Sequence, residues 1–458
     1  GTSFEPRRID ERVNLMETLL PVVAASNNRG GGSGEGPGSS ASAGTYILET
    51  GGILSTDPRL WTDGDEGGYD TLSPTAVAKN ALVVGSTYDI AEGYTGPSDV
   101  VIAPFSAFGP TDDGRIKPDI VAAGIKDITS PRNLLGTEEA IEATFDPVDP
   151  LNMDSYALTT GTSISAPVVT GGLALALQKR LQLKPDWGTN DYPIRASTLR
   201  GLAIHTPDVA GPNPGPDFKF GYGLLNGLTA ASLMGSDASV GIKPHVREIY
   251  IPTSLATSSF KVRAVDSSKP LKVTIAWTDP AGSASAAGVV DPTAKRLVNN
   301  IDLRVVDPSN VSHMPWVLNP DLIGKSSAVR SSGATKGNDT TNNVEQVQID
   351  SPLLGVDYTV KVNAAGALAW GGQWVSVIMS NNTVPDLPFE VTTFTQYDAD
   401  TWYMEWNSVP GGVYGVQFST DLVNWYDVSV GLNAVSDVSS AYLDVSTPSG
   451  FFRGVRYY

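Results

Sequence analysis

The chain of 458 residues contains no cysteine, which excludes a disulfide framework, a thiolate zinc site and a cysteine nucleophile. Histidine is almost as scarce, because His205, His245 and His313 are the full set. The place of each histidine therefore decides whether this chain has histidine-dependent chemistry available to it.

Positive charge is also in short supply. The chain has 31 Lys and Arg against 49 Asp and Glu, which gives a formal net charge of −18. A nucleic-acid binder needs a basic face to neutralise phosphates. A protein that binds an anionic membrane surface also needs a basic face. No apolar run reaches the roughly 18 residues that a membrane span needs. We therefore expect no nucleic-acid partner and no membrane span.

What the chain does have is material for packed cores, since 41% of its residues are hydrophobic and only 17% are charged. Its length corresponds to about three domains at roughly 150 residues each. The sequence begins Gly-Thr-Ser, with neither the charged nor the apolar region of a signal peptide. We expect it to be a fragment or the product of a processed precursor.

The first half of the chain alternates between helical and strand patterns. Helical spacing predicts a helix over 12–20, and a long apolar stretch predicts another over 166–183. Short apolar runs at 22–25, 81–84 and 119–123 are typical of buried parallel strands. The alternation predicts an α/β region with a parallel sheet.

The pattern changes near residue 245. Between 247 and 379, short β-rich runs such as 271–277 and 358–362 alternate apolar and polar residues, as antiparallel strands with one wet face do. Similar runs recur at 402–406 and 413–418. The second half of the chain is therefore predicted to be antiparallel β structure.

One segment has the form of a nucleophile turn. In Gly161–Pro167, a glycine-bounded turn opens onto the long predicted helix. The unpaired N–H groups and positive dipole end of such a helix can stabilise an oxyanion beside Ser163. The alternative is structural, with Thr162 or Ser163 acting only as the helix N-cap.

This segment resembles the nucleophile motif of subtilisin-like serine proteases, Gly-Thr-Ser followed by a small or apolar pair, Ala and Pro. Val22–Gly30 is similar to that family's oxyanion strand, Val-Val-Ala-Ala-Gly-Asn-x-Gly. Three further segments resemble motifs of the family and follow in the family's order: Ala78–Ser86, Ser106–Ile120 and Phe220–Asn226.

The resemblance implies roles for individual residues. Ser163 is the nucleophile, and aligning Gly30 with the last glycine of the oxyanion strand makes Asn28 the oxyanion donor. The neighbouring Asn27 is the alternative donor. The residues before Asn28 are implied to bind substrate: Ala25, Ser26 and Asn27.

The sequence departs from the family where the triad's Asp and His belong. The family's histidine precedes the serine in a His-Gly-Thr motif, but all three histidines here follow Ser163 and none precedes a glycine. We therefore expect both residues, and the first half of the domain, to be absent from this chain. The order Ser…Asp…His of α/β-hydrolases is a weaker alternative, because Ser165 stands where their Gly-x-Ser-x-Gly elbow has glycine, and His205 reads as a helix end packed on the core.

The β-rich part after residue 245 resembles the jelly-roll-like domain that follows the catalytic domain in some long alkaline subtilases. The likeness rests on 271–279 and 298–303. Such domains often bind calcium, which prefers oxygen ligands in loops. The predicted ligands are Asp279, Asn300 and Asp302, and the alternative is that these residues only cap strands and turns.

The last 70 residues resemble a small β module of exported bacterial proteins, through Ser419–Trp425 and Phe451–Arg453. Exposed aromatic residues of such a module can bind glycans or a surface. Trp402, Trp406 and Trp425 are nevertheless predicted to lie in its core.

These patterns together predict an α/β fold that is the C-terminal half of a subtilisin-like parallel-sheet domain, followed by an antiparallel β-sandwich and a small β module. The predicted units are a partial peptidase domain (1–240), a jelly-roll-like domain (241–380), a linker (381–388) and a C-terminal module (389–458). The implied function is a secreted serine endopeptidase acting on polypeptides. The alternative is an inactive pseudoprotease or a binding scaffold.

Overall fold

The structure is a computed structural model. It describes most of the chain: residues 4–27, 29, 68–125, 128–131, 156–183, 194–240, 245–253, 257–284, 293–318, 330–383, 390–398, 400–408, 413–434, 438–444 and 450–456.

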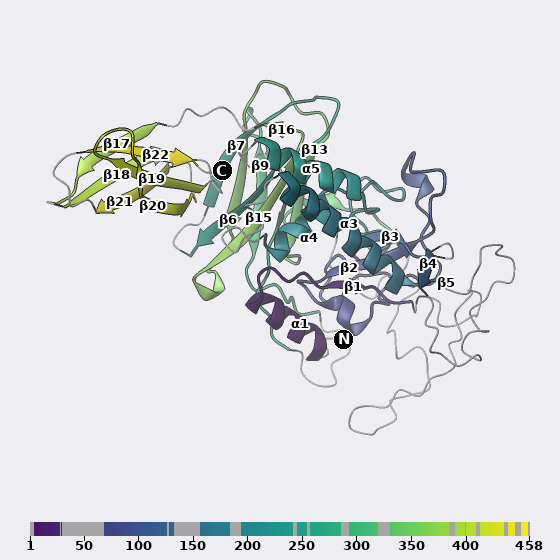
Figure 1. Ribbon diagram of the computed structural model, residues 1–458. Coiled ribbons are helices and arrows are strands. Elements are labelled where there is room, and N and C mark those ends of the chain that lie inside the picture. The colour runs from purple at the N-terminus through teal and green to yellow at the C-terminus, as the bar shows by residue number, and fades with distance from the viewer. Residues whose placement is uncertain are drawn as a thin grey trace.

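A three-stranded parallel sheet forms the centre of the N-terminal region. Its order is β1 (Val22–Ala24), β2 (Leu82–Thr87) and β3 (Ile120–Ala123), each paired in parallel with the next. All six residues of β2 are buried, as the apolar runs predict. Helix α3 (Thr162–Leu183) lies across one face of this sheet (Figure 1).

Three other helices and several short elements surround the sheet. The helices are α1 (Phe4–Leu15), α4 (Ala196–His205) and α5 (Gly227–Val240). The short elements are η2 (Pro74–Val77), η3 (Pro97–Asp99) and the antiparallel pair β4 (Ile128–Pro131) and β5 (Tyr156–Thr159). Helix α5 packs on α3, and all ten residues of α4 are buried.

The helix predicted over 12–20 is wrong in its position. Helix α1 ends at Leu15, and Met16 and Leu19 are 53% and 43% exposed. Val13 is buried, and the side chain of Asn14 donates to the carbonyl of Asp279 at 2.7 Å. The observed helix therefore overlaps the predicted range only at residues 12–15, and two of its contacts come from this overlap.

Two antiparallel sheets face each other in the middle of the chain. One has the order β10-β9-β14-β7-β16 and the other β13-β8-β15-β6. Their strands are β6 (Val246–Pro252), β7 (Thr257–Ala264), β8 (Leu271–Ala276), β9 (Ile301–Val306), β10 (Ser312–His313), β13 (Val344–Ile349), β14 (Tyr358–Ala364), β15 (Gly372–Ser380) and β16 (Asn382–Thr383). A small pair, β11 (Trp316–Val317) with β12 (Thr335–Lys336), and η6 (Ala369–Gly371) complete this region. We call these two sheets the sandwich.

The sandwich and the parallel-sheet region share a hydrophobic core. Leu82 and Ile120 of the parallel sheet belong to the same buried cluster as Leu202 of α4 and Ile378 of β15. A second cluster, with Leu303 and Val360 among its members, fills the space between the two sandwich sheets. Helix α4 therefore joins the two regions, which pack as neighbours in Figure 1.

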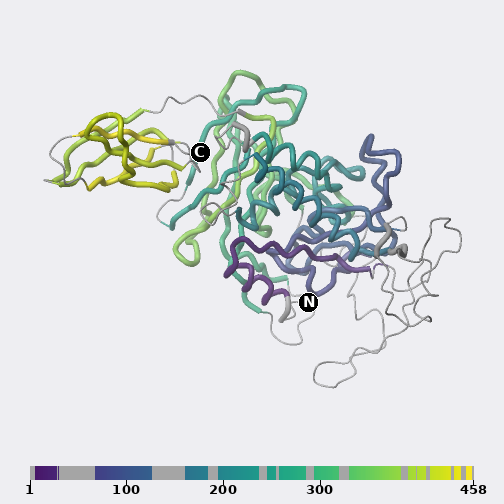
Figure 2. The backbone as a smooth tube through the Cα atoms, viewed as in Figure 1, coloured from purple at the N-terminus to yellow at the C-terminus, as the bar shows by residue number. Residues whose placement is uncertain are grey.

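The C-terminal module consists of two three-stranded antiparallel sheets, β17-β18-β21 and β20-β19-β22. Its strands are β17 (Val391–Gln396), β18 (Thr401–Asn407), β19 (Val413–Ser419), β20 (Tyr426–Asn433), β21 (Val438–Asp444) and β22 (Phe451–Arg456). It has its own buried cluster and stands to one side of the sandwich (Figure 2). Trp406 is fully buried, as predicted, whereas Trp425 lies outside the cluster beneath the Arg453 guanidinium, 4.2 Å from its ring centroid.

The predicted fold class is confirmed, because a parallel sheet with helices is followed by antiparallel β structure. The linker predicted over 381–388 overlaps β16, whose two residues pair with β7. No helix in the described ranges is long and apolar enough to cross a membrane.

Candidate active site

Ser163 lies at the second position of α3, where the helix begins at the carboxyl edge of the parallel sheet. Ser163 is exposed, whereas its neighbours Gly161, Thr162 and Ser165 are buried. The 22-residue helix places unpaired N–H groups and its positive dipole end beside this hydroxyl. An oxyanion formed at Ser163 therefore meets a positive electrostatic environment.

Two glycines allow the turn before Ser163 to approach strand β3. The N–H of Gly161 donates to the carbonyl of Gly124 at 2.8 Å. A Cβ atom on Gly124 would lie 2.1 Å from the hydroxyl oxygen of Ser165, closer than any real contact. Gly161 has a φ of 149°, which side chains rarely adopt. Both positions require glycine, so the turn that carries Ser163 is tightly fixed.

Asn27 holds this turn from the other side. Its side-chain carbonyl accepts the N–H of Thr162 at 2.8 Å and the Thr162 hydroxyl at 2.9 Å. The amide nitrogen of Asn27 lies next to Gly161, 2.9 Å from where a Cβ atom would stand. With its oxygen engaged, the side chain presents its N–H₂ group as a donor at the nucleophile turn.

The backbone before Asn27 clarifies the alignment. Ser26 has a φ of 128°, in the region that favours glycine. Read without a gap from Val22, the family pattern Val-Val-Ala-Ala-Gly-Asn puts its glycine on Ser26 and its asparagine on Asn27. Asn28, which the sequence favoured as the donor, lies outside the described residues.

The three residues predicted to contact substrate differ in burial and in their hydrogen bonds. Ala25 is fully buried, its N–H donates to Val84 and its carbonyl accepts from Ser73, so it has no free group to offer a substrate. The carbonyl of Ser26 accepts from Ala107 at 3.0 Å, and its N–H points to the Thr162 hydroxyl at 3.4 Å. Of the three predicted substrate contacts, Asn27 is exposed, Ser26 is half-buried and Ala25 is buried.

Each histidine side chain contacts a residue of the sandwich. His205 at the end of α4 is buried, with its Nδ1 2.8 Å from the Thr274 hydroxyl, and burial lowers its pKa well below the ordinary value. His245 bonds to Asn382, and His313 lies 3.4 Å from Asp307. No hydrogen bond or ion pair joins any of them to Ser163 within the described part of the chain.

Asp279, one of the predicted calcium ligands, is buried at the contact between the parallel-sheet region and the sandwich. Its carboxylate forms a buried ion pair with Lys79 and accepts the N–H groups of Val298 at 2.9 Å and Asn299 at 2.7 Å. Its backbone carbonyl accepts from Asn80 at 2.9 Å. Each carboxylate oxygen already has a donor, and together these bonds tie the parallel-sheet region to the sandwich.

Asn300 and Asp302 remain compatible with a cation. The Oδ1 atoms of both are buried, and neither has a hydrogen-bond partner among the residues that the structure describes. The Oδ1 of Asn363, opposite Asp302 in the β9–β14 register, is in the same state. Burial raises the pKa of Asp302, and Arg304 opposes this at 3.6 Å. Three hard oxygen atoms without donors suit a calcium ion chemically. The described residues contain no group of three or more acidic or histidine side chains able to hold a metal.

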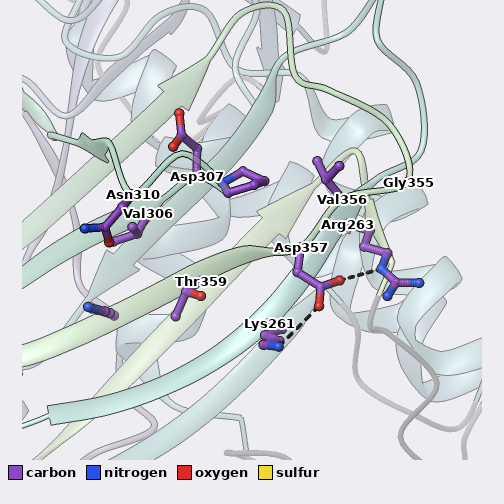
Figure 3. Close-up of a pocket in the computed structure, with 11 residues that line it drawn as sticks. Lys261, Arg263, Val306, Asp307, Asn310, Gly355, Val356, Asp357 and Thr359 are labelled. Carbon is purple, nitrogen blue, oxygen red and sulfur yellow. Dashed lines mark hydrogen bonds and ion pairs between the residues drawn. The ribbon is translucent and has the colours of Figure 1, made fainter.

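The sandwich also has a hollow on its outer face. Lys261, Arg263 and Lys361 line it together with Asp357. Figure 3 shows the Asp357 carboxylate between two of these cations, 2.5 Å from Arg263 and 3.3 Å from Lys261. These bonds hold the pKa of Asp357 below its usual range, although burial opposes them. The residues that line the hollow include none of those predicted for catalysis.

Comparison with known proteins agrees with the geometry at Ser163. Residues 3–223 match the model of the subtilase family. The chain is 24% identical over 273 residues to the serine protease/ABC transporter B family protein tagA of Dictyostelium discoideum, covering 58% of this chain and 14% of that protein. It is 31% identical over 123 residues to the serine protease AprX of Bacillus subtilis, covering 25% of this chain and 24% of that protein.

The chain thus spans less than a quarter of the length of these two relatives. Among solved structures, a serine protease of Aeromonas sobria matches 82% of this chain and 68% of its own, at 14% identity and a TM-score of 0.29. Residues 3–223, just under half of the chain, are therefore similar to the subtilase family.

Proposed function

We propose that this chain carries the nucleophile and the oxyanion donors of a serine endopeptidase that cleaves polypeptides outside the cell. Ser163 attacks the scissile carbonyl, and the resulting oxyanion accepts hydrogen bonds from the Ser163 N–H and the Asn27 amide. The observation that carries this proposal is the exposed Ser163 at the start of α3, with Asn27 bonded to the adjacent Thr162.

The general base has to come from another polypeptide segment. A serine hydroxyl is a weak nucleophile without a base, and His205, His245 and His313 all contact the sandwich instead. The open edge of β1 supports this view, because among the described residues β1 pairs with β2 alone. Its free N–H and C=O groups offer a place for a further parallel strand.

Chemical rescue tests the proposal on the chain as it is. With a fluorophosphonate probe, the Ser163 oxygen attacks phosphorus, fluoride leaves, and added imidazole takes the hydroxyl proton. We expect negligible labelling without imidazole and labelling that rises with imidazole concentration. Ser163→Ala must abolish it. Robust peptide hydrolysis by the chain alone, lost in Ser163→Ala, contradicts the need for an external base. Absence of labelling at every imidazole concentration favours the pseudoprotease alternative.

The same assay separates the two asparagines. Removing one oxyanion donor costs about 10²–10³ in rate. Asn27→Leu keeps the size and removes the donor, so we expect a loss of that order, with Asn28→Leu as the matched control. Loss in Asn28→Leu alone restores the first alignment. Equal rates in both variants remove the oxyanion role from this turn.

We also propose a calcium ion bound by Asn300, Asp302 and Asn363 on the sandwich. The support is the set of three buried oxygen atoms described above, which lack donors among the described residues. The role is structural, because Asp302 and Asn363 lie on strands of the sandwich, Asn300 directly precedes β9, and none of them lies at Ser163.

A further inference from the structure

Three tyrosines form a cluster on the outer face of the sheet β17-β18-β21. Tyr403 of β18 and Tyr442 of β21 are direct cross-strand partners, with ring centroids 5.2 Å apart. The ring of Tyr397, which follows β17, lies 5.0 Å from that of Tyr442. We call these three residues the tyrosine face.

The tyrosine face is not needed to build the core of the module. The opposite side of the same sheet buries Met404, Trp406 and Leu443 almost completely. By contrast, Tyr397 and Tyr442 are 66% and 60% exposed. Contiguous exposed aromatic surface on a folded domain is a mark of an interaction site.

The surroundings of the tyrosines are polar and without positive charge. The Tyr403 hydroxyl donates to Glu405 at 3.1 Å, and the Thr401 hydroxyl donates to Asp444 at 3.2 Å. Strands β17, β18 and β21 contain no Lys or Arg. From residue 389 onward the chain has two arginines, both in β22 of the other sheet, and eight acidic residues. An anionic ligand is therefore repelled from this face.

We propose that the tyrosine face binds an uncharged polysaccharide. Tyrosine rings offer an apolar surface with a polar tip, and the C–H side of a pyranose ring stacks on such a surface. The hydroxyls and carboxylates beside the rings match the hydroxyl groups at the edge of a sugar. The spacing of neighbouring ring centroids is comparable with the length of one sugar unit, so successive units can meet successive rings.

A protein partner fits this face less well. The buried centres of protein interfaces are depleted in charged residues and enriched in Met, Arg and aromatic residues. Here the outer positions next to the tyrosines hold short hydroxyl side chains and an acid: Thr393, Thr395, Glu405 and Ser440. The assignment of this face does not depend on peptidase activity.

Affinity electrophoresis of the full chain tests the proposal. With a sequence pI of about 4.5, the protein migrates towards the anode in a native gel, whereas an embedded uncharged polymer stays in place. The probes are hydroxyethyl cellulose, galactomannan and pullulan, with alginate as the anionic comparison. We expect at least one uncharged polymer to retard the chain, alginate to have no effect, and added salt to change little.

The variants decide whether the tyrosine face is responsible. Tyr442→Ala should weaken binding about tenfold or more, whereas Tyr442→Phe keeps the ring and most of the affinity. Tyr426→Ala is the matched control, because Tyr426 is 67% exposed on β20 of the other sheet of the same module. Because Tyr442 is exposed, its variants should keep the wild-type melting temperature.

Several results overturn the proposal. They are no retardation by any of the three uncharged polymers, equal retardation of Tyr442→Ala and wild type, and stronger retardation by alginate. Self-association of the wild type that Tyr442→Ala abolishes also overturns it, since the face is then a protein interface.

Discussion

The parallel-sheet region and the sandwich bury their apolar surfaces to different extents. Between the sandwich sheets, residues such as Leu303, Val360 and Val377 are completely buried. In the parallel-sheet region, β1 is only half-buried and pairs with β2 alone among the described strands, and Leu175 of α3 is 63% exposed. The sandwich completes its own core, whereas the region that carries Ser163 leaves apolar surface open. The exposed apolar surface therefore lies in the same region as Ser163.

The contact that joins these two regions is the place where a single change should cost most. Lys79→Met removes the cation from the fully buried Asp279 carboxylate. An unpaired buried charge destabilises a protein by about 3–5 kcal/mol, so we expect a loss of that order in urea unfolding. The double variant Lys79→Met, Asp279→Leu should recover much of the loss, because it removes the stranded charge. A loss below about 0.5 kcal/mol in the single variant means that the two regions do not depend on this pair.

A pair of leucines tests the contrast in burial directly. Leu303→Ala empties space in the sandwich core and should cost about 2–5 kcal/mol. Leu175→Ala removes the same atoms from an exposed helix face and should stay within about 0.5 kcal/mol. Both are measured by denaturant unfolding of the full chain. Equal losses of stability in the two variants mean that this face of α3 is covered in solution, so that the two regions do not differ in burial.

The sequence patterns identify elements better than they identify contacts. Apolar runs locate β1, β2 and β3, because buried parallel strands need unbroken hydrophobic side chains. They do not locate the partner of Asp279, since Lys79 is 200 residues away and nothing local to either residue indicates the other.

The oxyanion turn shows a different limit. Ser26 adopts a glycine-like φ of 128° although it is not glycine. An alignment that matches glycines therefore favours Asn28 as the donor, whereas an alignment without a gap favours Asn27. The bonds from Thr162 to Asn27 depend on the folded turn, and no local sequence pattern indicates them.

The tyrosine face was partly readable from the sequence. Alternation along 401–407 places Tyr403 on the side opposite to the buried Met404 and Trp406. The pairing of Tyr403 with Tyr442 joins residues of strands that are not consecutive, and no local pattern specifies it. Side-chain periodicity gives the two faces of a strand, whereas the sheet order decides which residues gather on one face.

Calcium provides a smaller test, confined to the sandwich. If Asn300, Asp302 and Asn363 bind the ion in the folded state only, calcium at about 100 times its dissociation constant adds about 2.7 kcal/mol of stability. We expect a higher melting temperature in excess calcium than in chelator, and a reduced difference in Asn363→Ala. Magnesium is the control, because it prefers six ligands in a strict octahedral arrangement. Identical melting curves in calcium and chelator contradict the site.

The smallest effect should come from acidification at the contact between α4 and the sandwich. Burial lowers the pKa of His205 well below its ordinary value of 6.5, with Lys272 and His245 adding to the effect. Below about pH 6.5, His205 is protonated in the unfolded chain but stays neutral in the folded chain. The free energy of unfolding therefore falls by about 1.4 kcal/mol for each further pH unit, down to the folded-state pKa. His245, whose pKa is also lowered mainly by burial, adds a change of the same sign.

Urea unfolding at successive pH values measures how steeply the free energy of unfolding falls with pH. His205→Gln should flatten it more than His245→Gln, because His205 is the more deeply buried of the two. A slope that His205→Gln leaves unchanged means that this imidazole is solvated in the native protein, and that the two regions are less tightly joined at α4 than the shared core indicates.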